Sequence, residues 1–385
     1  MNLERYKTEL ETLQLTDNFR WLRKGSQQGV HFQQNENRLL NFSSNDYLGI
    51  AGNTKLKEEF FNNLGQSCDL GAAASRLLTG NHNAYRLLEQ DLSEAYCGRS
   101  VLVFNSGYHA NMGILPALAG KNDLILADKL VHASMIDGLR LCDAKVMRYR
   151  HLGYDHLISL LEKNRSQYER VFIVSESVFS MDGDVADLKQ LVEIKNQYDA
   201  FLYLDEAHSV GAYGKTGLGL CEQEDVIKDI DLLVGTFGKA FGSMGAFVVC
   251  HEILADYLVN KMRTLIFTTA LPEINVAWTR FVFKRIRQMK QERIHLQKLS
   301  AQLRHGLKNH GFETMGDSQI VPMIAGKNEL ALRWSEQLAG KGYWAMAVRY
   351  PTVPKGSARI RFSLSSAMRT DHIKKLIKTL ANTCL

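Results

Sequence analysis

Short runs of β-branched and other apolar residues alternate with helical patterns between Arg38 and Cys250. This alternation is typical of strands and crossover helices in a mainly parallel sheet. In the helical segment 187–198, apolar residues such as Leu188 and Leu191 keep the spacing of one helix face. The predicted strands are 101–104, 124–127, 145–149, 171–175, 201–204, 232–235 and 246–250, and further predicted helices are 84–96 and 134–141.

The pattern changes after about residue 272. A long charged helix is predicted through Arg287, Arg293 and Arg304, followed by short strands and a closing helix at 371–381. The first forty residues fit a helix and a hairpin. We therefore expect an α/β fold in three parts: an N-terminal segment (1–40), a large domain with a mainly parallel central sheet (41–285) and a smaller α+β C-terminal domain (286–385).

The composition allows a large core and gives no sign of a membrane segment. The chain has 385 residues, of which 45% are hydrophobic, so it can form more than one domain. Its longest apolar runs are far shorter than the roughly 20 residues that cross a bilayer. Residues 1–15 lack the apolar region and cleavage site of a signal peptide. We expect a cytoplasmic protein with no membrane partner.

Charge and cysteine content narrow the class of ligand. The net charge is +6, but Lys and Arg are spread along the chain rather than gathered in one stripe. This spread favours an ordinary basic surface over a nucleic-acid-binding surface. The positive net charge is also compatible with an acidic small-molecule substrate. The six cysteines show neither Cys-x-x-Cys pairs nor histidines at zinc spacing, so we interpret them as reduced thiols and expect no metal site.

Polar residues directly follow two of the predicted strands. Asp205 and His208 follow the run 201–204, and Lys239 follows the run 232–235. The carboxyl ends of parallel strands meet at the edge where α/β sheets place their sites. One strand end therefore supplies a carboxylate and an imidazole, and the other supplies an amine.

These groups suit a pyridine-ring cofactor. A carboxylate such as Asp205 keeps the ring nitrogen protonated, so that the ring accepts electrons, and an amine such as Lys239 forms a Schiff base. Taken alone, a lysine is more often a solvated surface residue, and a carboxylate after a strand is often only a helix cap. Their joint placement at two strand ends favours the catalytic interpretation.

A third strand end supplies a candidate anion site. Ser106, Gly107 and Tyr108 follow the run 101–104 and lead into a predicted helix. Backbone N–H groups at a helix N-terminus bind phosphate, and a glycine allows close approach. A single Ser-Gly before a helix is weak evidence, but it supplies the anion site that a phosphorylated pyridine cofactor requires.

Six motifs follow one another along the chain: 45–49, the segment around His132, 176–184, 205–208, 236–239 and 359–361. Their order resembles that of the α-oxoamine synthases, and the likeness extends from about residue 38 to about residue 370. The resemblance implies a fold-type-I transferase that uses pyridoxal 5'-phosphate and acts as a homodimer.

The resemblance also implies roles for individual residues. Lys239 carries the cofactor, Asp205 pairs with the ring nitrogen, and His132 stacks on the ring and polarises the thioester carbonyl. Further contacts are implied for His208 and Ser180 near the ring hydroxyl, for Gly107, Tyr108 and Thr236 at the phosphate, and for Thr268 and Thr269 at the phosphate of the partner subunit.

Some of these residues have a second interpretation. A histidine such as His132 at the start of a helix is usually a cap or a packed ring. Asn45 and Arg361 resemble the groups that bind the amino-acid carboxylate, with Arg349 as a second candidate. Residues two apart in a strand point to the same face, so Arg359 and Arg361 share one face. The sequence therefore does not decide which task each of the two has.

The family condenses an amino acid with an acyl-CoA thioester and releases carbon dioxide and CoA. Segments 41–49 and 75–82 favour the members that use L-alanine and a pimeloyl thioester, with CoA or acyl-carrier protein as donor. The alternatives are members that use glycine and acetyl-CoA, and a catalytically inactive binding relative. From charge alone, we hypothesise that Arg20 or Arg23 meets the far carboxylate of the pimeloyl chain.

Overall fold

The computed structural model describes residues 3–64 and 68–383, so Cys384 lies outside the described residues. The chain forms two compact units. Unit 1 consists of Met1–Gly52, Met181–Asp184 and Ile294–Leu385, and unit 2 consists of Asn53–Ser180 and Val185–Arg293. The N-terminal forty residues therefore group with the C-terminal part of the chain.

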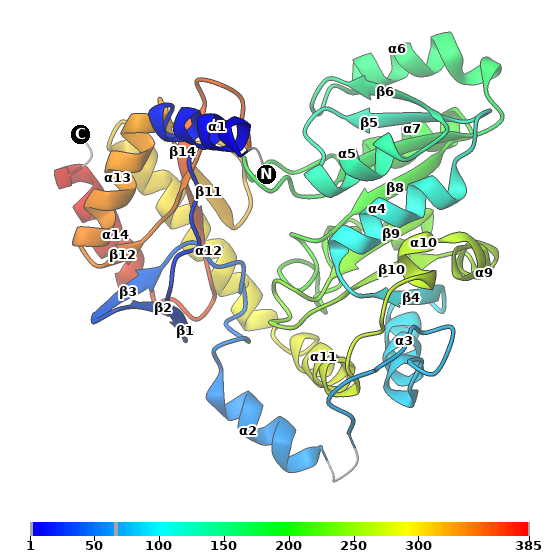
Figure 1. Ribbon diagram of the computed structural model, residues 1–385, viewed down its shortest axis with the longest axis horizontal. Helices are drawn as coiled ribbons and strands as arrows, with labels where there is room; N and C mark the ends of the chain where they lie inside the picture. Colours follow the sequence, from blue (N-terminus) through cyan, green and yellow to red (C-terminus); the bar gives the residue numbers. More distant parts are fainter. Residues whose placement is uncertain (1–2, 65–67, 384–385) are drawn as a thin grey trace. The chain divides into compact units, whose positions relative to one another are not determined.

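Unit 2 is built on a sheet of seven strands: β4 (Ser100–Phe104), β5 (Leu124–Asp128), β6 (Lys145–Tyr149), β7 (Val171–Glu176), β8 (Phe201–Asp205), β9 (Leu232–Thr236) and β10 (Ala246–Cys250). Their order in the sheet is β4-β10-β9-β8-β7-β5-β6 (Figure 1). Strand β10 is antiparallel to β4 and β9, and the other neighbours are parallel. The seven predicted strands and the mainly parallel sheet are confirmed.

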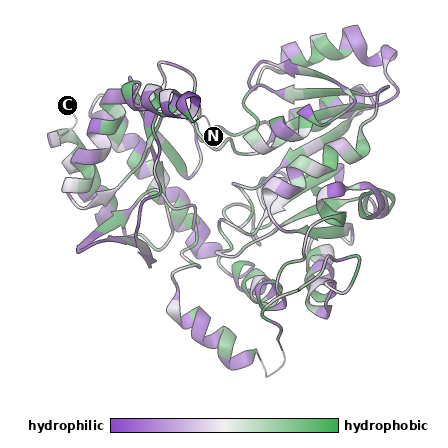
Figure 2. Ribbon diagram, in the orientation of Figure 1, coloured by the Kyte–Doolittle hydropathy of each residue, from purple (hydrophilic) through white to green (hydrophobic). Residues whose placement is uncertain are grey.

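Apart from the edge strand β6, the strands form here because their apolar runs are buried on both sides. All four residues of the segment 124–127 in β5 are fully buried. Successive side chains of a strand point to opposite faces, so both faces of the sheet are covered, as is usual for parallel sheets. Figure 2 shows the central strands of this sheet as mostly hydrophobic, whereas the helices carry both hydrophobic and hydrophilic residues.

The helices of unit 2 are α2 (Thr54–Asn63), α3 (Asn83–Ala95), α4 (Gly107–Leu118), α5 (Ala133–Arg140), α6 (Tyr154–Asn164), α7 (Leu188–Gln197), α8 (Leu220–Gln223), α9 (Glu252–Lys261), α10 (Arg263–Ile266) and α11 (Glu273–Ile286). Helices α3, α5 and α7 confirm the three helices predicted between the strands. One core cluster joins the sheet to α4, α5, α9 and α10. In the part of the chain that the structure describes, no helix has both the length and the apolar character needed to cross a membrane.

Unit 1 contains α1 (Glu4–Leu15), β1 (Ser26–Gln28), β2 (His31–Gln34), β3 (Asn37–Asn41), β11 (Ile320–Gly326), α13 (Asn328–Gly340), β12 (Tyr343–Trp344), β13 (Ala347–Val348), β14 (Ala358–Ser363) and α14 (Thr370–Thr383). The predicted N-terminal helix and hairpin are present as α1 and the antiparallel β2–β3 pair. Strand β12 pairs with β3 in parallel, which joins the hairpin to C-terminal residues. A second sheet has the order β11-β14-β13.

The prediction of one long charged helix through Arg287 is wrong, because the chain forms two separate helices around this residue. Helix α11 ends at Ile286, and α12 (Lys290–Asn309) starts in unit 2 and continues into unit 1. The guanidinium of Arg293 donates to the carbonyl of Ile286 at 2.7 Å. An uninterrupted helix would use that carbonyl for a backbone N–H four residues later, so Arg293 caps the end of α11.

Candidate active site

The carboxyl ends of three parallel strands lie side by side in unit 2. Glu176 at the end of β7 is opposite Asp205 at the end of β8, and β9 pairs next to β8 and ends at Thr236. A cavity of about 170 Å³ at this edge is lined by Gly107, Tyr108, Asn111, His132, Ser134, Glu176, Asp205, Ala207, His208, Thr236 and Lys239. Seven of the residues predicted for the site therefore share one cavity.

The carboxylate of Asp205 is held from two sides. The backbone N–H of Ala207 donates to Oδ1 at 2.8 Å, and Nδ2 of Asn111 donates to Oδ2 at 2.8 Å. The hydroxyl of Tyr203 donates to the side-chain amide oxygen Oδ1 of Asn111 at 2.6 Å. Because Asp205, Asn111 and Tyr203 are all buried, the network fixes the direction of the carboxylate.

His132 is both a helix cap and a member of the cavity lining. It is the N-cap of α5, and its Nδ1 accepts the backbone N–H of Ser134 at 3.2 Å. The cap interpretation is therefore correct and does not exclude a role in the cavity. The surrounding protein desolvates the imidazole and lowers the pKa of His132; the Asp205 carboxylate opposes this and Lys239 adds to it.

Glu176 binds the backbone of His132. Its Oε1 accepts the backbone N–H of His132 at 2.5 Å, and the residue is only 2% exposed. Burial raises the pKa of Glu176 well above its ordinary value, and the nearby Asp205 charge adds to the rise. The protonated form of Glu176 is thus favoured beside the ionisable groups of the cavity.

Helix α4 begins at the cavity. Its N-cap is Ser106, whose Oγ accepts the backbone N–H of His109 at 3.2 Å. The first N–H groups of a helix have no partner within the helix, so those of Gly107 and Tyr108 can serve an anion. A Cβ added at Gly107 would meet nothing nearer than Thr236 at 3.8 Å, which leaves room for close approach.

Three of the predicted cofactor residues are absent from the lining of this cavity. Ser180 is buried and is the last residue of unit 2 before the Met181–Asp184 segment. Thr268 and Thr269 follow α10, and Thr269 forms an isolated bridge with Ser75. The expected contact of Thr268 and Thr269 with a partner subunit's phosphate stays a prediction.

Unit 1 holds the predicted carboxylate-binding residues. Oδ1 of Asn45 accepts hydrogen bonds from Nη1 of Arg361 at 3.2 Å and from Oγ of Ser363 at 3.3 Å. Arg359 forms an ion pair with Asp182. Because Arg359 already faces a carboxylate whereas Arg361 faces an amide oxygen, Arg361 is the better candidate for a substrate carboxylate.

Arg349 and Arg20 form a different cluster within unit 1. The guanidinium of Arg349 donates to the backbone carbonyls of Asp17 and Phe19. Nη2 of Arg20 donates to Oγ1 of Thr352 at 2.9 Å. Desolvation lowers the pKa of Arg349, and the nearby charge of Arg20 adds to this effect. Two positive charges placed this close together suit an anionic ligand.

The sequence prediction missed four residues of the lining, namely Ala207 and the polar residues Asn111, Ser134 and Glu176. Asn111 lies one helical turn after Gly107, and Ser134 lies two residues after His132. Glu176 ends β7 in the same way that Asp205 ends β8. The position of Glu176 at the end of the strand that begins with the apolar run 171–174 was the available signal, whereas Asn111 looks like an ordinary helix residue.

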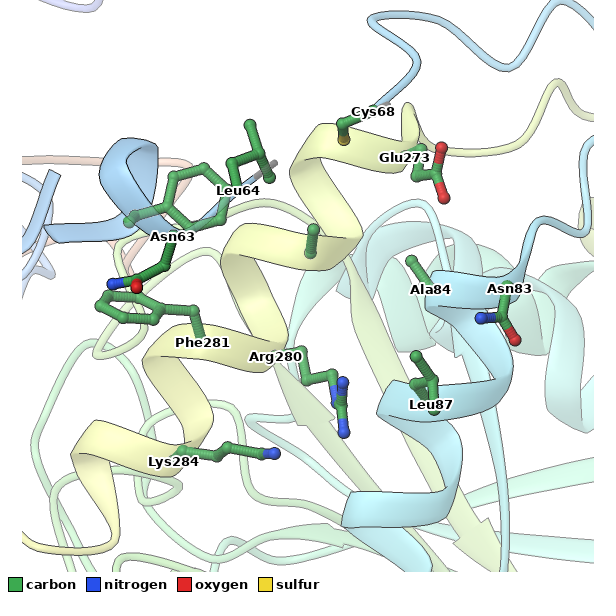
Figure 3. A pocket seen from close by; sticks show the side chains of 12 residues that line it. Asn63, Leu64, Cys68, Asn83, Ala84, Leu87, Glu273, Arg280, Phe281 and Lys284 are labelled. Carbon is green, nitrogen blue, oxygen red and sulfur yellow. The ribbon is translucent and has the colours of Figure 1, made fainter. Parts of the chain in front are cut away.

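A larger cavity of about 360 Å³ lies elsewhere in unit 2 (Figure 3). It lies between α3 and α11, with Arg280 and Lys284 among its lining residues. Both cations pair with Asp91 on α3, at 2.7 Å and 3.4 Å. Its charges are already satisfied within the protein, so this cavity is a poor candidate for the chemistry.

Comparison with known proteins settles the family. A family model described as aminotransferase class I and II matches residues 37–380. The chain belongs to that family. A protein of Haemophilus influenzae strain 86-028NP, provisionally named 8-amino-7-oxononanoate synthase, is 51% identical over 380 residues, covering 98% of this chain and all of that protein. A protein of Pasteurella multocida with the same provisional name is 50% identical over 378 residues, covering 97% and 98% of the two chains.

Solved structures extend the likeness to the fold. A serine palmitoyltransferase from S. paucimobilis, bound to a pyridoxal-phosphate–myriocin adduct, matches with a TM-score of 0.90 at 27% identity, over 99% of this chain and 97% of that one. An 8-amino-7-oxononanoate synthase from Francisella tularensis matches with a TM-score of 0.75 at 29% identity, over 89% and 97%. The α-oxoamine synthase resemblance, the fold-type-I transferase fold and the pyridoxal-phosphate cofactor are confirmed.

The cavity residues fit this cofactor. Lys239 offers a primary amine, Asp205 offers an oriented carboxylate, and the N-terminus of α4 offers N–H groups for a phosphate. Thr236 lies beside Gly107 and adds a hydroxyl near that end. An amine, a carboxylate and an anion site are the three groups that pyridoxal phosphate needs from a protein.

Proposed function

We propose that this enzyme condenses L-alanine with a pimeloyl thioester to give 8-amino-7-oxononanoate, carbon dioxide and the free thiol, a step of biotin biosynthesis. The donor is pimeloyl-CoA or a pimeloyl-acyl-carrier protein. The names of the relatives at 51% and 50% identity support this assignment. The observation that carries it is the single cavity in which Lys239, Asp205 and His132 meet.

Each cavity residue has a defined task in this reaction. When bound, pyridoxal phosphate withdraws electrons from the α-carbon of the amino acid, which eases loss of a proton and later of carbon dioxide. Lys239 would hold the cofactor covalently, and its amine, when free, would remove the α-proton of the amino acid. Asp205 pairs with the ring nitrogen and keeps it protonated. His132 would lie in the cavity beside the bound cofactor and would donate a hydrogen bond to the thioester carbonyl, where negative charge develops.

Residues of unit 1 recognise the two substrates. Asn45 and Arg361 bind the carboxylate of L-alanine, which is supported by the hydrogen bond that already pairs them. Arg20, together with Thr352, binds the far carboxylate of the pimeloyl chain. Arg349 adds positive charge beside Arg20. A guanidinium is suited to both tasks because it donates two parallel hydrogen bonds to a carboxylate.

The enzyme acts as a homodimer in this proposal. Thr268 and Thr269 reach the phosphate bound by the partner subunit. Exposed apolar side chains near these threonines support a subunit contact there, since Phe267 is 71% exposed and Leu78 is 77% exposed. Small-molecule substrates and a second copy of the chain are the partners that the proposal needs.

Thiol release from a panel of substrate pairs tests the proposed reaction. The cofactor-loaded enzyme is incubated with alanine, glycine or serine and with pimeloyl-CoA, palmitoyl-CoA or acetyl-CoA, and the Lys239→Ala variant serves as the inactive control. L-alanine with pimeloyl-CoA is expected to give the highest kcat/KM. Preference for glycine with acetyl-CoA would instead make the protein a glycine C-acetyltransferase, and no turnover of any pair would make it an inactive binding relative.

A further inference from the structure

In one buried chain of hydrogen bonds, the chemistry of the groups determines which one donates and which one accepts at each link. A carboxylate only accepts hydrogen bonds, so the side of Asn111 that lies 2.8 Å from Asp205 Oδ2 must be its NH₂ group. The amide oxygen of Asn111 then faces the hydroxyl of Tyr203 at 2.6 Å, and that hydroxyl must donate. Burial raises the pKa of Tyr203 well above its ordinary value, which keeps this donor protonated.

The chain continues from Asn111 to His132. The second N–H of Asn111 points to Oγ of Ser134 at 3.0 Å, so that oxygen is an acceptor. The hydrogen of the Ser134 hydroxyl is then available for Nδ1 of His132, which lies 2.7 Å away. Asn111 and Ser134 are 2% and 1% exposed, so water does not compete for these bonds.

Nδ1 of His132 therefore accepts from two donors. One is the hydroxyl of Ser134, and the other is its backbone N–H at 3.2 Å. A hydrogen on Nδ1 would point at these donors, which disfavours both the Nδ1–H tautomer and the charged imidazolium. A neutral imidazole has one N–H group, so the hydrogen is left on Nε2.

We infer that Asn111 and Ser134 are positioning residues that fix neutral His132 as its Nε2–H tautomer, a hydrogen-bond donor. The inference deepens the proposed function and rests on it, because Nε2–H is the group that donates to the thioester carbonyl. Asp205 sets the direction of the whole chain. The same carboxylate that serves the cofactor ring therefore also determines which nitrogen of His132 carries a proton.

Nitrogen NMR on histidine-labelled protein tests the tautomer directly. Long-range ¹H–¹⁵N correlation spectra of the apoprotein and of the cofactor-loaded protein distinguish a protonated from an unprotonated ring nitrogen, and His132→Gln assigns the signals. We expect Nε2 protonated and Nδ1 unprotonated. A proton on Nδ1, an even mixture of tautomers or a charged ring at neutral pH would overturn the inference.

Variants at Ser134 and Asp205 test whether this hydrogen-bond chain sets the tautomer of His132. Ser134→Ala removes one donor to Nδ1 and is expected to shift the tautomer ratio about tenfold toward Nδ1–H, the value of one neutral hydrogen bond. Ser300→Ala is the matched control, since Ser300 is equally buried but bonds only carbonyls of its own helix, and the His132 signals should not change. If Ser134→Ala does not fold, Asp205→Asn is used instead. An amide at position 205 allows the side-chain amide of Asn111 to flip and exchange its donor and acceptor, which should weaken the preference of His132 for the Nε2–H tautomer.

Unchanged His132 signals in a folded Ser134→Ala or Asp205→Asn protein would refute the role of this chain. These spectra use no substrate, so their outcome is independent of the reaction. An enzyme that turns over alanine and pimeloyl-CoA but has the proton on Nδ1 refutes only the tautomer inference. An Nε2–H tautomer in a protein without that turnover refutes only the proposed function.

Discussion

Asp205 is the side chain on which the proposed chemistry depends most. It ends β8, accepts hydrogen bonds from Ala207 and Asn111, and is only 6% exposed. A simple helix cap uses one carboxylate oxygen, as Oδ1 does here with the N–H of Ala207. The buried amide of Asn111 also orients the other oxygen, Oδ2, which a cap does not require. The geometry thus favours an electrostatic task for this carboxylate.

Replacing Asp205 by Asn should raise the activation barrier by several kcal/mol and so lower kcat on the order of a thousandfold. The reason is that a neutral amide does not hold the ring nitrogen protonated. Single-turnover kinetics of cofactor-loaded protein measure this effect. Asp199→Asn is the control, since its side chain is 98% exposed. Near wild-type kcat in the Asp205→Asn variant would contradict the assigned role.

Arg20 is tested through substrate binding rather than through rate. Arg20→Ala should raise KM for pimeloyl-CoA about tenfold with a much smaller change in kcat, because it removes a charged hydrogen bond to the far carboxylate. The control is a CoA ester of a similar chain without that carboxylate, whose KM should not change. The hypothesis fails if KM for pimeloyl-CoA is the same in variant and wild type.

At the scale of elements, Glu206 connects the end of β8 to the loop that leads into α8. Its Oε1 accepts the backbone N–H groups of Leu220 at 2.9 Å and Cys221 at 3.2 Å. Gly219 has a φ of +106°, and a Cβ there would lie 2.4 Å from Oε2, so only glycine fits. This buried carboxyl holds the loop next to the residue that serves the cofactor.

The pH dependence of stability tests Glu206. Burial raises the pKa of Glu206 from 4.5 to about 7, so the folded state binds its proton more tightly than the unfolded state. Its stabilising contribution is complete below the unfolded value and is lost as the pH rises through about 7. Glu206→Gln has no such proton, so its free energy of unfolding should fall less between about pH 5 and about pH 8, by on the order of 2 kcal/mol.

Urea denaturation at the two pH values measures this difference. Glu162→Gln, an exposed position on α6, should behave like the wild type. Parallel pH dependence of the wild type and Glu206→Gln would contradict the account of this carboxyl.

The elements themselves were largely readable from the sequence. Apart from the edge strand β6, the strands of the large sheet are short, mostly apolar and buried, so each gives a hydrophobic run. The break between α11 and α12 was not readable, although Arg293 caps the end of α11 by donating to the carbonyl of Ile286. Such a cap has no fixed sequence spacing.

At the scale of the whole molecule, exposed apolar side chains gather on two paired segments of unit 2. Leu77 and Leu78 follow Ser75, and Phe267 precedes Thr269, where the two segments form a bridge. Large exposed apolar patches usually mark an interaction site. In the proposed homodimer this surface meets the second copy.

Leu78→Asp should therefore shift the protein toward monomer and lower its activity, because a charge would be buried in the subunit contact. Sedimentation velocity measures the oligomeric state. Ile253→Asp is the matched control, since Ile253 is 70% exposed on α9. A Leu78→Asp protein that keeps the assembly state of the wild type would contradict this surface as the contact.

The site was readable only in part. Asp205 and Thr236 end strands that begin as apolar runs, and Lys239 follows Thr236 by three residues, so a sequence pattern identifies them. The grouping of Asn111 with Tyr203, and of Asn45 with Arg361, depends on tertiary packing between residues far apart in the chain. Hydrophobic periodicity carries no information about such pairs.

The attachment of the cofactor is the most direct test of the central claim. Borohydride reduction of the cofactor-loaded protein, followed by proteolysis and mass spectrometry, locates the lysine to which pyridoxal phosphate is joined. We expect one labelled peptide, the one that contains Lys239, and no label at that site in Lys239→Ala. Labelling of a different lysine, or of none, would contradict it.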